Sequence, residues 1–148
     1  MIPEPHYTLI NTSKGKDPAV VVVNSALRNF QNRASFPWHL EIKVSCKNLG
    51  ANGMPTTEET EILHQLESGI SNSLQVQREA LFLARITCRG KRELIYRVRD
   101  SKTAGAILQQ CVTDPLQLRE WSYLMKQDVA WELAQAELNL LVRDNRFN

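Results

Sequence analysis

Basic side chains are concentrated in one short stretch of this chain, between residues 85 and 102. Against two acidic residues, the stretch holds seven basic ones: Arg85, Arg89, Lys91, Arg92, Arg97, Arg99 and Lys102. The whole chain of 148 residues has a formal net charge of only +2, so the cluster is local. Such a cluster predicts a surface that faces anions, on either an acidic protein partner or RNA phosphates.

The same residues also fit a structural explanation. Arginine and lysine are common at exposed strand edges, where their charge opposes edge-to-edge pairing between molecules. In that case Arg97 and Arg99 would pair with Glu41 or Glu120 on other strands. Nucleic acid is the less favoured partner, because an RNA-recognition sheet needs exposed aromatic rings and Tyr96 falls on the apolar side of its strand.

Histidine and cysteine residues do not show the spacing of a metal site or of an activated nucleophile. Cys46, Cys88 and Cys111 lie far apart among apolar neighbours, which predicts reduced thiols in the core. We therefore predict no metal, no cofactor and no catalytic constellation. His39 and Glu41 do share the polar face of one predicted strand.

An alternative hypothesis starts from that shared face. If Arg97 and Arg99 lie on the neighbouring strand, they join His39 and Glu41 as the polar groups of a pocket beneath the N-terminal segment. The pocket would serve a small ligand or an enzyme reaction. Two other patterns predict structure alone: the glycines at 50 and 53 indicate a turn, and the aromatic residues at 121, 123 and 131 indicate core packing.

The basic cluster is carried by two alternating runs at residues 79–100, joined by the turn Cys88-Arg89-Gly90-Lys91. Alternation on both sides of a short turn is typical of a β-hairpin. The same alternation predicts strands at residues 38–46 and 119–126, and a β-branched run indicates a further strand at residues 19–23. Residues 24–33 indicate a short helix or an extended flap.

Helices are predicted between these strands. Thr56 and Glu59 have the spacing of a capping box at the start of an amphipathic segment. Asp100 caps a shorter amphipathic segment after the hairpin. A last helix, apolar on more than one side, is predicted from Asp128 to about Val142.

The element order from residue 38 to residue 126 is therefore β-α-β-β-α-β, which is the order of ferredoxin-like folds. It predicts an α+β fold, with an antiparallel sheet, both helices on one face, and the strands at Trp38 and Arg92 as central neighbours. Residues 1–18 are rich in turn formers and predict an irregular lead-in to a single domain over residues 19–148.

Three features of the sequence bear on the cellular compartment: signal patterns, apolar segments and cysteines. No segment has the pattern of a secretion signal or the apolar length of a membrane span. The odd number of separated cysteines favours a reducing environment. The sequence therefore predicts a cytoplasmic protein.

Several short motifs resemble a bacterial family known as domain of unknown function 695, over residues 19–141. They are Phe36-Pro37, Gly53-Met54-Pro55 with Glu58-Glu59, Leu66-Glu67, Gly90-Lys91-Arg92-Glu93 with Tyr96 and Asp100, and Asp128 with Trp131. The family's closing motif is Asp-Pro-x-Trp, and Val129 stands here in place of the proline. Valine should leave the helix start intact, because proline there only pre-sets the first turn. The resemblance implies a ferredoxin-like fold and no established activity.

The favoured hypothesis is a non-catalytic interaction or regulatory module. It would hold a protein partner, which an acidic surface would suit, on the basic hairpin and the polar sheet face around His39. Alternatively, the apolar last helix would bind the partner or a second copy of the chain. A small-ligand site or enzyme pocket is the second hypothesis, and RNA binding through the basic hairpin is the third.

Overall fold

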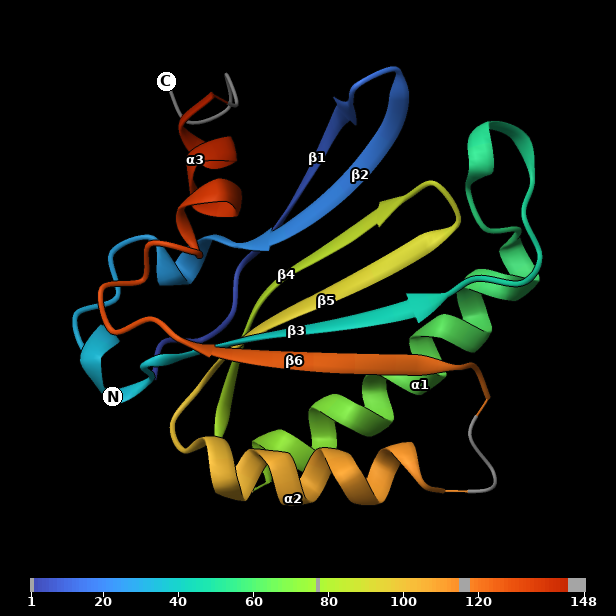
Figure 1. Cartoon of the computed structure of the whole chain (residues 1–148). Coiled ribbons are helices and arrows are strands. Elements are labelled where there is room, and N and C mark those ends of the chain that lie inside the picture. The colour runs from blue at the N-terminus through green and yellow to red at the C-terminus, as the bar shows by residue number, and fades with distance from the viewer. Residues whose placement is uncertain (1, 77, 115–117, 144–148) are drawn as a thin grey trace.

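The computed structural model describes residues 2–76, 78–114 and 118–143. In these residues the chain forms one six-stranded antiparallel sheet with the strand order β1-β2-β4-β5-β3-β6 (Figure 1). The strands are β1 (Tyr7–Lys14), β2 (Asp17–Asn24), β3 (Trp38–Ser45), β4 (Ala80–Cys88), β5 (Lys91–Val98) and β6 (Trp121–Gln127). The α-helices are α1 (Thr57–Gln75), α2 (Ser101–Val112) and α3 (Gln135–Arg143), and short 3₁₀ turns lie at Ser25–Leu27, Arg33–Ser35 and Ala51–Gly53.

The predicted hairpin is present as β4 and β5, with Cys88 opposite Lys91. Its two turn residues, Arg89 and Gly90, have φ angles of 54° and 73°. Two left-handed residues in a row define the turn whose twist matches that of antiparallel strands. The strand at residue 38 is indeed the neighbour of β5, with His39 opposite Arg97.

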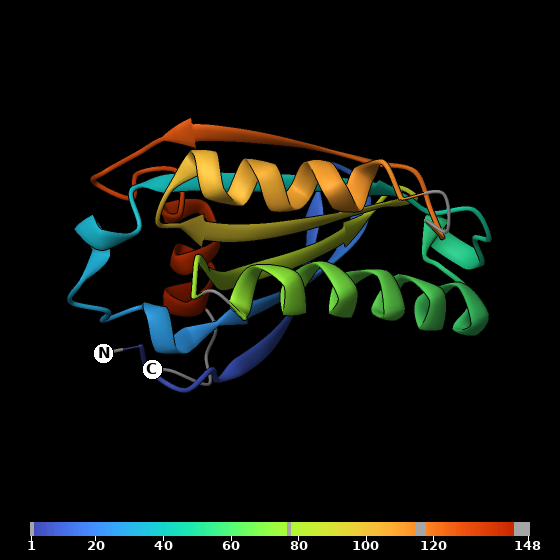
Figure 2. The same cartoon turned by 90° about the horizontal axis from the view of Figure 1, so that it is seen from below.

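Both predicted helices cover the same face of the sheet, which we call the α1/α2 face (Figure 2). The Thr56 side chain accepts a hydrogen bond from the backbone N–H of Glu59, and Asp100 accepts one from the N–H of Thr103, so both predicted N-caps are confirmed. The reciprocal half of the capping box does not form, because the Glu59 carboxylate bonds to Arg119 and to the N–H of Lys47. The apolar side chains of the two helices pack on the inward residues of β3 and β5, such as Leu40 and Tyr96.

A second core lies on the opposite face, which we call the α3 face because α3 packs there against β2. Val21, Leu83, Leu138 and Leu141 are buried in this core together with the indole of Trp131. The apolar side of α3 therefore packs against the chain's own sheet. No helix in the described part of the chain is long and apolar enough to cross a membrane.

The N-terminal hairpin is the main departure from the predicted fold. Residues 7–14, expected as part of an irregular lead-in, form β1, and the sheet has six strands where a ferredoxin-like sheet has four. Thr8 and Ile10 alternate with outward residues and face Val23 and Val21 of β2. The prolines and the glycine around this run concealed the alternation, because such residues are typical of irregular segments, although only Gly15 lies in the turn between β1 and β2.

The start of the last helix is the second departure. Asp128 was expected to cap it directly, but α3 begins at Gln135. The Asp128 carboxylate accepts hydrogen bonds from the backbone N–H groups of Glu132 and Leu133, which closes a separate turn. Trp131 within that turn has a φ of 60°, so a continuous helix cannot pass through it.

Candidate functional site

Arg97, expected in an anion-binding cluster, is fully buried (0% exposed) on the α3 face. Its Nη1 donates to Asp128 Oδ2 at 2.9 Å, and its Nη2 donates to the Asp128 carbonyl oxygen at 2.6 Å. The Phe36 carbonyl oxygen accepts further bonds from Nε and Nη2, and the guanidinium carbon lies 4.6 Å from the centre of the Trp131 ring. Enclosed in this way, Arg97 fastens the segment after β6 to the sheet and is not open to an external anion.

His39 is buried beside Arg97 and is not poised as a general base. Burial, followed by the charge of Arg97, lowers the pKa of the imidazole, which favours its neutral form. Arg97 Nη1 lies 3.1 Å from Nδ1, and because a guanidinium can only donate, Nδ1 accepts and the ring proton lies on Nε2. Nε2 then faces Glu41 Oε1 at 3.6 Å. Both ring nitrogens are therefore engaged with side chains of the protein.

The other basic residues of the predicted cluster are distributed over different parts of the fold. Arg85 and Arg92 lie on the α1/α2 face, where Arg85 pairs with Glu67 and Arg92 Nε donates to the hydroxyl of Thr87 at 3.2 Å. Arg99 is exposed, with its guanidinium carbon 5.0 Å from the centre of the Phe36 ring. Arg89, in the β4–β5 turn, pairs with Asp17 in β2. Lys102 is exposed at the start of α2. The seven residues therefore do not form one patch.

A different basic surface is assembled where three strand ends meet. Its five exposed lysines, which we call the lysine rim, are Lys14, Lys16, Lys43, Lys47 and Lys91. The strand register places three of them on the α3 face. Lys91 lies opposite Ser45, which is two residues from Lys43 and therefore on the same face of β3. The residue pairs that link β5 through β4 and β2 to β1 place Thr12, and therefore Lys14, on this face as well. Lys16 lies in the β1–β2 turn and Lys47 just after β3.

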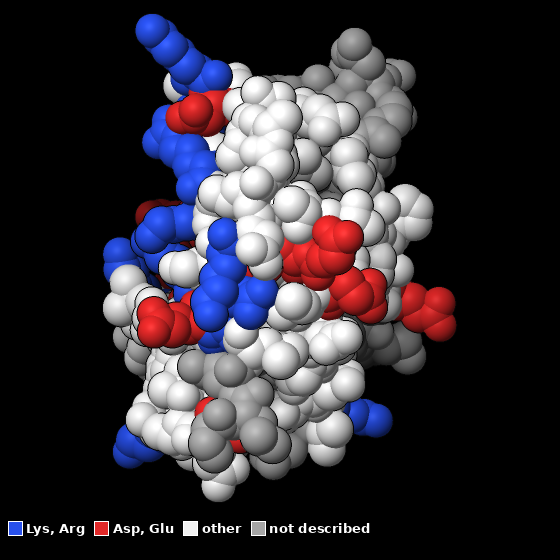
Figure 3. All heavy atoms as spheres, turned by 90° about the vertical axis from the view of Figure 1, so that its right-hand side faces the viewer, with Lys and Arg blue, Asp and Glu red and all other residues white. Residues whose placement is uncertain are grey.

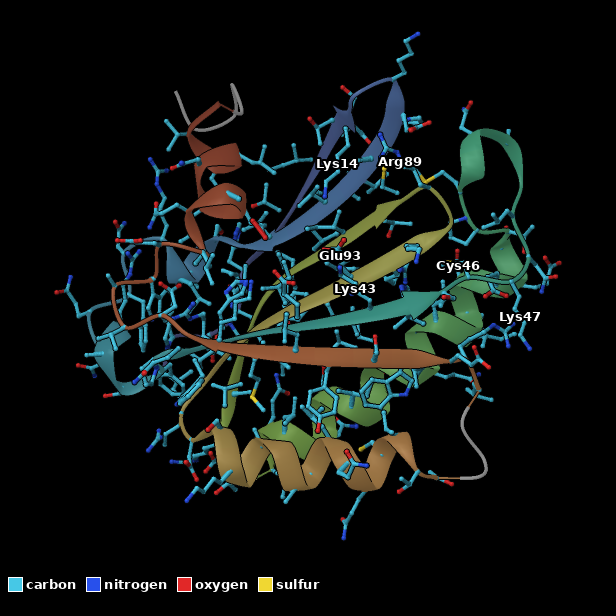
Figure 4. All side chains as sticks on the ribbon, in the orientation of Figure 1. Lys14, Lys43, Cys46, Lys47, Arg89 and Glu93 are labelled. Atoms are coloured by element: carbon cyan, nitrogen blue, oxygen red, sulfur yellow. The ribbon has the colours of Figure 1, made fainter. Side chains whose placement is uncertain are left out.

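The side chains of Lys14 and Lys43 lie on the part of the sheet that α3 leaves uncovered, and Lys47 lies at its right-hand end (Figure 4). From that end, basic atoms line one margin of the molecule, starting at the tip of the β1–β2 hairpin, while acidic atoms gather on the other side (Figure 3). The sequence stretch around the β4–β5 hairpin contributes only Lys91 to the rim. Sequence reasoning missed the others because they come from segments that are distant along the chain.

Backbone contacts between the turns fix the position of the rim. The N–H of Gly90 donates to the carbonyl oxygen of Gly53 at 3.0 Å, and the carbonyl of Gly90 accepts from Cys46 at 3.0 Å. Arg89 Nη2 donates to the carbonyl oxygen of Lys14 at 2.8 Å. The β1–β2 turn, the β4–β5 turn and the loop before α1 are thus tied together. Left-handed backbone at Gly15, Gly53 and Gly90 allows these close approaches.

Carboxylates lie on the same face, inward from the lysines. Glu93 is opposite Lys43 in the register, and the two appear on the same surface of the sheet in Figure 4. Glu137 of α3 is buried, which raises its pKa to about 7; Lys14 acts against this rise, and Glu93 and Glu41 add to it. The rim therefore borders a mixed-charge surface and not a uniformly basic one.

A cleft of about 350 Å³ lies on the α1/α2 face between α1 and the β1–β2 hairpin, with Phe82 in its wall. Its principal polar groups are paired with one another. Arg85 donates to both carboxylate oxygens of Glu67 at 2.6 Å, and the hydroxyls of Ser71 and Tyr96 are 2.5 Å apart. Ser68, Asn72 and Gln75 are further polar residues that line the cleft.

The remaining candidates have structural positions. Trp121 and Tyr123 pack on the α1/α2 face while Trp131 lies in the core of the α3 face, so they do not line one pocket. The segment with Gly50 and Gly53 forms a turn. Among the described residues, no group of histidine, cysteine and acidic side chains is arranged to hold a metal ion.

Residues 8–135 match a family model described as a family of unknown function, DUF695. The chain belongs to this family. No curated protein and no solved structure matches it. The motifs behind the DUF695 resemblance have clear roles in the fold: Asp128 and Trp131 enclose Arg97, and Gly53 receives the β4–β5 turn. Val129, at the position of the family's proline, is exposed.

Proposed function

We propose that this chain is a non-catalytic binding module that holds an acidic protein partner on the lysine rim. The observation that carries the proposal is the meeting of five exposed lysines from separate segments at the uncovered end of the sheet. Arg89 supports this arrangement, because its bonds to Asp17 and to the Lys14 carbonyl hold the two hairpin turns together. A cationic surface of this kind attracts acidic partners and orients them as they approach.

A protein fits this surface better than RNA does. Binding of single-stranded RNA relies on exposed aromatic rings that stack on bases, and the five rim residues are all lysines. Glu93 lies within the same surface and would repel a phosphate backbone, whereas a protein partner can place a basic group beside it.

The non-catalytic part of the proposal rests on the state of the polar groups. His39 has both ring nitrogens engaged, and Arg97 is enclosed by Asp128, Phe36 and Trp131. Two of the four groups expected in an enzyme pocket, His39 and Arg97, are therefore used to build the fold.

Two broader assignments accompany the function. The order β6-β3-β5-β4, with α1 and α2 on one face, supports a ferredoxin-like unit to which the β1–β2 hairpin has been added. The free thiols of Cys46, Cys88 and Cys111 support a reducing compartment such as the cytoplasm.

A charge-matched pair of triple variants tests the binding function. The rim variant carries Lys43→Gln, Lys47→Gln and Lys91→Gln. The control carries Arg28→Gln, Arg78→Gln and Lys102→Gln, which remove the same charge from exposed positions outside the rim. Fluorescence anisotropy measures binding to a labelled polyglutamate peptide and, in parallel, to a single-stranded RNA.

We expect the original chain and the control to bind the peptide alike and the rim variant to bind it at least about tenfold more weakly. Equal loss in both variants would show a response to net charge alone and would contradict the proposal. Tighter binding of RNA than of the peptide, lost in the rim variant, would also contradict it and would favour the RNA hypothesis.

A further inference from the structure

Strand β6 forms one margin of the sheet and pairs on its inner side with β3 (Figure 2). The N–H of Ser45 donates to the Glu120 carbonyl, and at the other end the N–H of Asp128 donates to the Pro37 carbonyl. In an antiparallel ladder these bonds recur at every second residue. The backbone groups of Ser122, Leu124 and Lys126 therefore face β3.

The intervening residues of β6 direct their backbone groups away from the sheet. These residues are Trp121, Tyr123, Met125 and Gln127, and in the described part of the chain their outward N–H and C=O groups meet no other strand. Figure 2 shows β6 at the outer margin, with α2 lying in front of β3 and not beyond β6. The outer edge of β6 is thus open to another strand.

This edge lacks the features by which proteins usually protect such strands. Natural edge strands carry prolines, bulges or several charges that prevent pairing with another chain. The sequence of β6 has no proline and one charged residue, Lys126, and its ladder with β3 runs without a register shift. Leu124 on the α3 face is 52% exposed. An edge of this kind is suited to pairing.

We propose that β6 pairs in antiparallel orientation with β6 of a second copy of this chain, centred on Tyr123, so that the two sheets become one. Outward-facing residues of the two copies lie opposite one another whenever the two-fold axis falls on a residue of β6 and not between two residues. With Tyr123 at the centre, Trp121 lies opposite Met125 of the other copy, and Ser122 lies opposite Leu124.

Charge complementarity favours this register, and it favours a second copy of the chain as the strand that pairs with the β6 edge. With Tyr123 at the centre, Glu120 of each copy lies opposite Lys126 of the other, and both side chains are exposed on the α3 face. Opposite charges facing each other across a strand pair stabilise the pairing, and like charges destabilise it. Centring on Leu124 would place Glu120 opposite Asp128, and centring on Met125 would place Leu124 opposite Lys126, so neither register forms the two ion pairs.

The dimer also leaves room for the helices. Gly105 is the residue of α2 that lies against β6, where an added Cβ would come within 3.7 Å of the Met125 methyl group. Tyr123 Oη donates to Gln109 Oε1 of α2 at 3.3 Å. The flank of α2 beside β6 is therefore uncharged at these positions, and two copies of α2 can approach the seam without repulsion there. The lysine rims of the two copies would lie on one face of the joined sheet.

Charge reversal tests the pairing independently of the binding function, because Glu120 and Lys126 are not part of the lysine rim. The variants are Glu120→Lys, Lys126→Glu and the double variant that exchanges the two charges. Analytical ultracentrifugation across a range of concentrations measures the dimer dissociation constant, and circular dichroism checks that each variant is folded.

We expect the original chain to dimerise, each single variant to dimerise at least about tenfold more weakly, and the double variant to recover. An original chain that stays monomeric at every concentration would overturn the proposal. So would a dimer that neither single variant weakens.

Cysteine cross-linking tests the register. Ser122→Cys and Leu124→Cys are made as separate single variants, with Leu133→Cys, exposed away from β6, as the control. Facing side chains of a non-hydrogen-bonded pair lie close enough for a disulfide. A mixture of the first two variants should give the mixed disulfide on mild oxidation, beyond the level seen for the original chain and the control. Cross-linking of Leu124→Cys alone to the same extent would overturn the register.

Discussion

Arg97 and Asp128 are joined by two hydrogen bonds although 31 residues separate them in the sequence. The carboxylate that receives Arg97 Nη1 at 2.9 Å also accepts backbone N–H groups from Glu132 and Leu133, at 3.0 and 2.9 Å. Arg97 of β5 thus holds the aspartate that closes the turn in which Trp131 enters the core. Because Asp128 both neutralises Arg97 and closes this turn, a substitution of Asp128 affects both interactions.

Replacement of Asp128 by alanine should therefore be strongly destabilising. The guanidinium of Arg97 would remain buried without its counter-charge, which typically costs about 3–5 kcal/mol. Urea unfolding, followed by tryptophan fluorescence, measures the change. Asp100→Ala provides the comparison, since it removes an exposed helix cap and should destabilise the protein much less. A cost for Asp128→Ala no greater than that of the cap would show that the pair is not a structural anchor.

Glu59 and Arg119 form a second buried pair, with consequences at low pH. Hydrogen bonding to Arg119 is the main cause that lowers the pKa of Glu59 from its ordinary value of 4.5 to about 2, and the backbone N–H of Lys47 adds to this effect. A carboxyl whose pKa is lowered by folding stabilises the protein above its unfolded pKa and loses this contribution as pH falls towards the folded value.

Glu59→Gln should accordingly be less stable than the original chain at pH 7, by about 3 kcal/mol for a buried ion that has lost its partner. The difference should shrink as the pH falls from 4.5 towards 2. Chemical unfolding at a series of pH values measures it. A difference that does not change with pH would assign the effect of the substitution to packing.

The parts of the fold that were predicted correctly are those encoded by neighbouring residues. The β4–β5 turn follows from Arg89 and Gly90, and the start of α1 follows from Thr56 three residues before Glu59. The lysine rim could not be predicted in this way, because Lys14 lies on β1 and Lys43 on β3, and the two strands share one face only through β2, β4 and β5 between them in the sheet.

The predicted basic cluster failed for a related reason. In a strand, successive side chains point to opposite faces, so a stretch that is dense in arginine is divided between two environments. Arg92 and Arg97 are both buried, but on opposite faces of β5. Alternation alone separates these two residues. It cannot show that Asp128, from beyond the last strand, would be the partner of Arg97.

Glu137 should make the protein less stable as the pH rises. Burial raises the pKa of its carboxyl to about 7, so the folded state holds the proton more tightly than the unfolded state does. Stability from such a group is present below the unfolded pKa and is lost as pH rises through the folded pKa. Lys14 faces the carboxyl and offsets part of the penalty, while Glu93 and Glu41 increase it.

Glu137→Gln removes this ionisation and should raise the free energy of unfolding at pH 8 by about 2–3 kcal/mol, with little change at pH 4. Denaturant unfolding at both pH values tests this. Glu132→Gln, at an exposed position before α3, is the control and should have little effect at either pH. If the original chain and Glu137→Gln show the same pH dependence, the carboxyl of Glu137 is hydrated in the folded protein and is ionised without cost.

Two glycines should respond to alanine in opposite directions. Gly90 has a φ of 73°, and a Cβ there would lie 3.0 Å from Leu49 Cδ1, so Gly90→Ala combines backbone strain with a close contact and should cost about 1–3 kcal/mol. Gly69 lies inside α1, and a Cβ there meets nothing within 4 Å, so Gly69→Ala should stabilise the helix by about 0.5–1 kcal/mol. Thermal unfolding of both variants measures the direction of each change in stability.

If the lysine rim depends on the tied turns, Gly90→Ala should also bind an acidic peptide more weakly than the original chain does, while Gly69→Ala should keep its affinity. Equal binding by the two variants would show that the lysines act without the support of the turn.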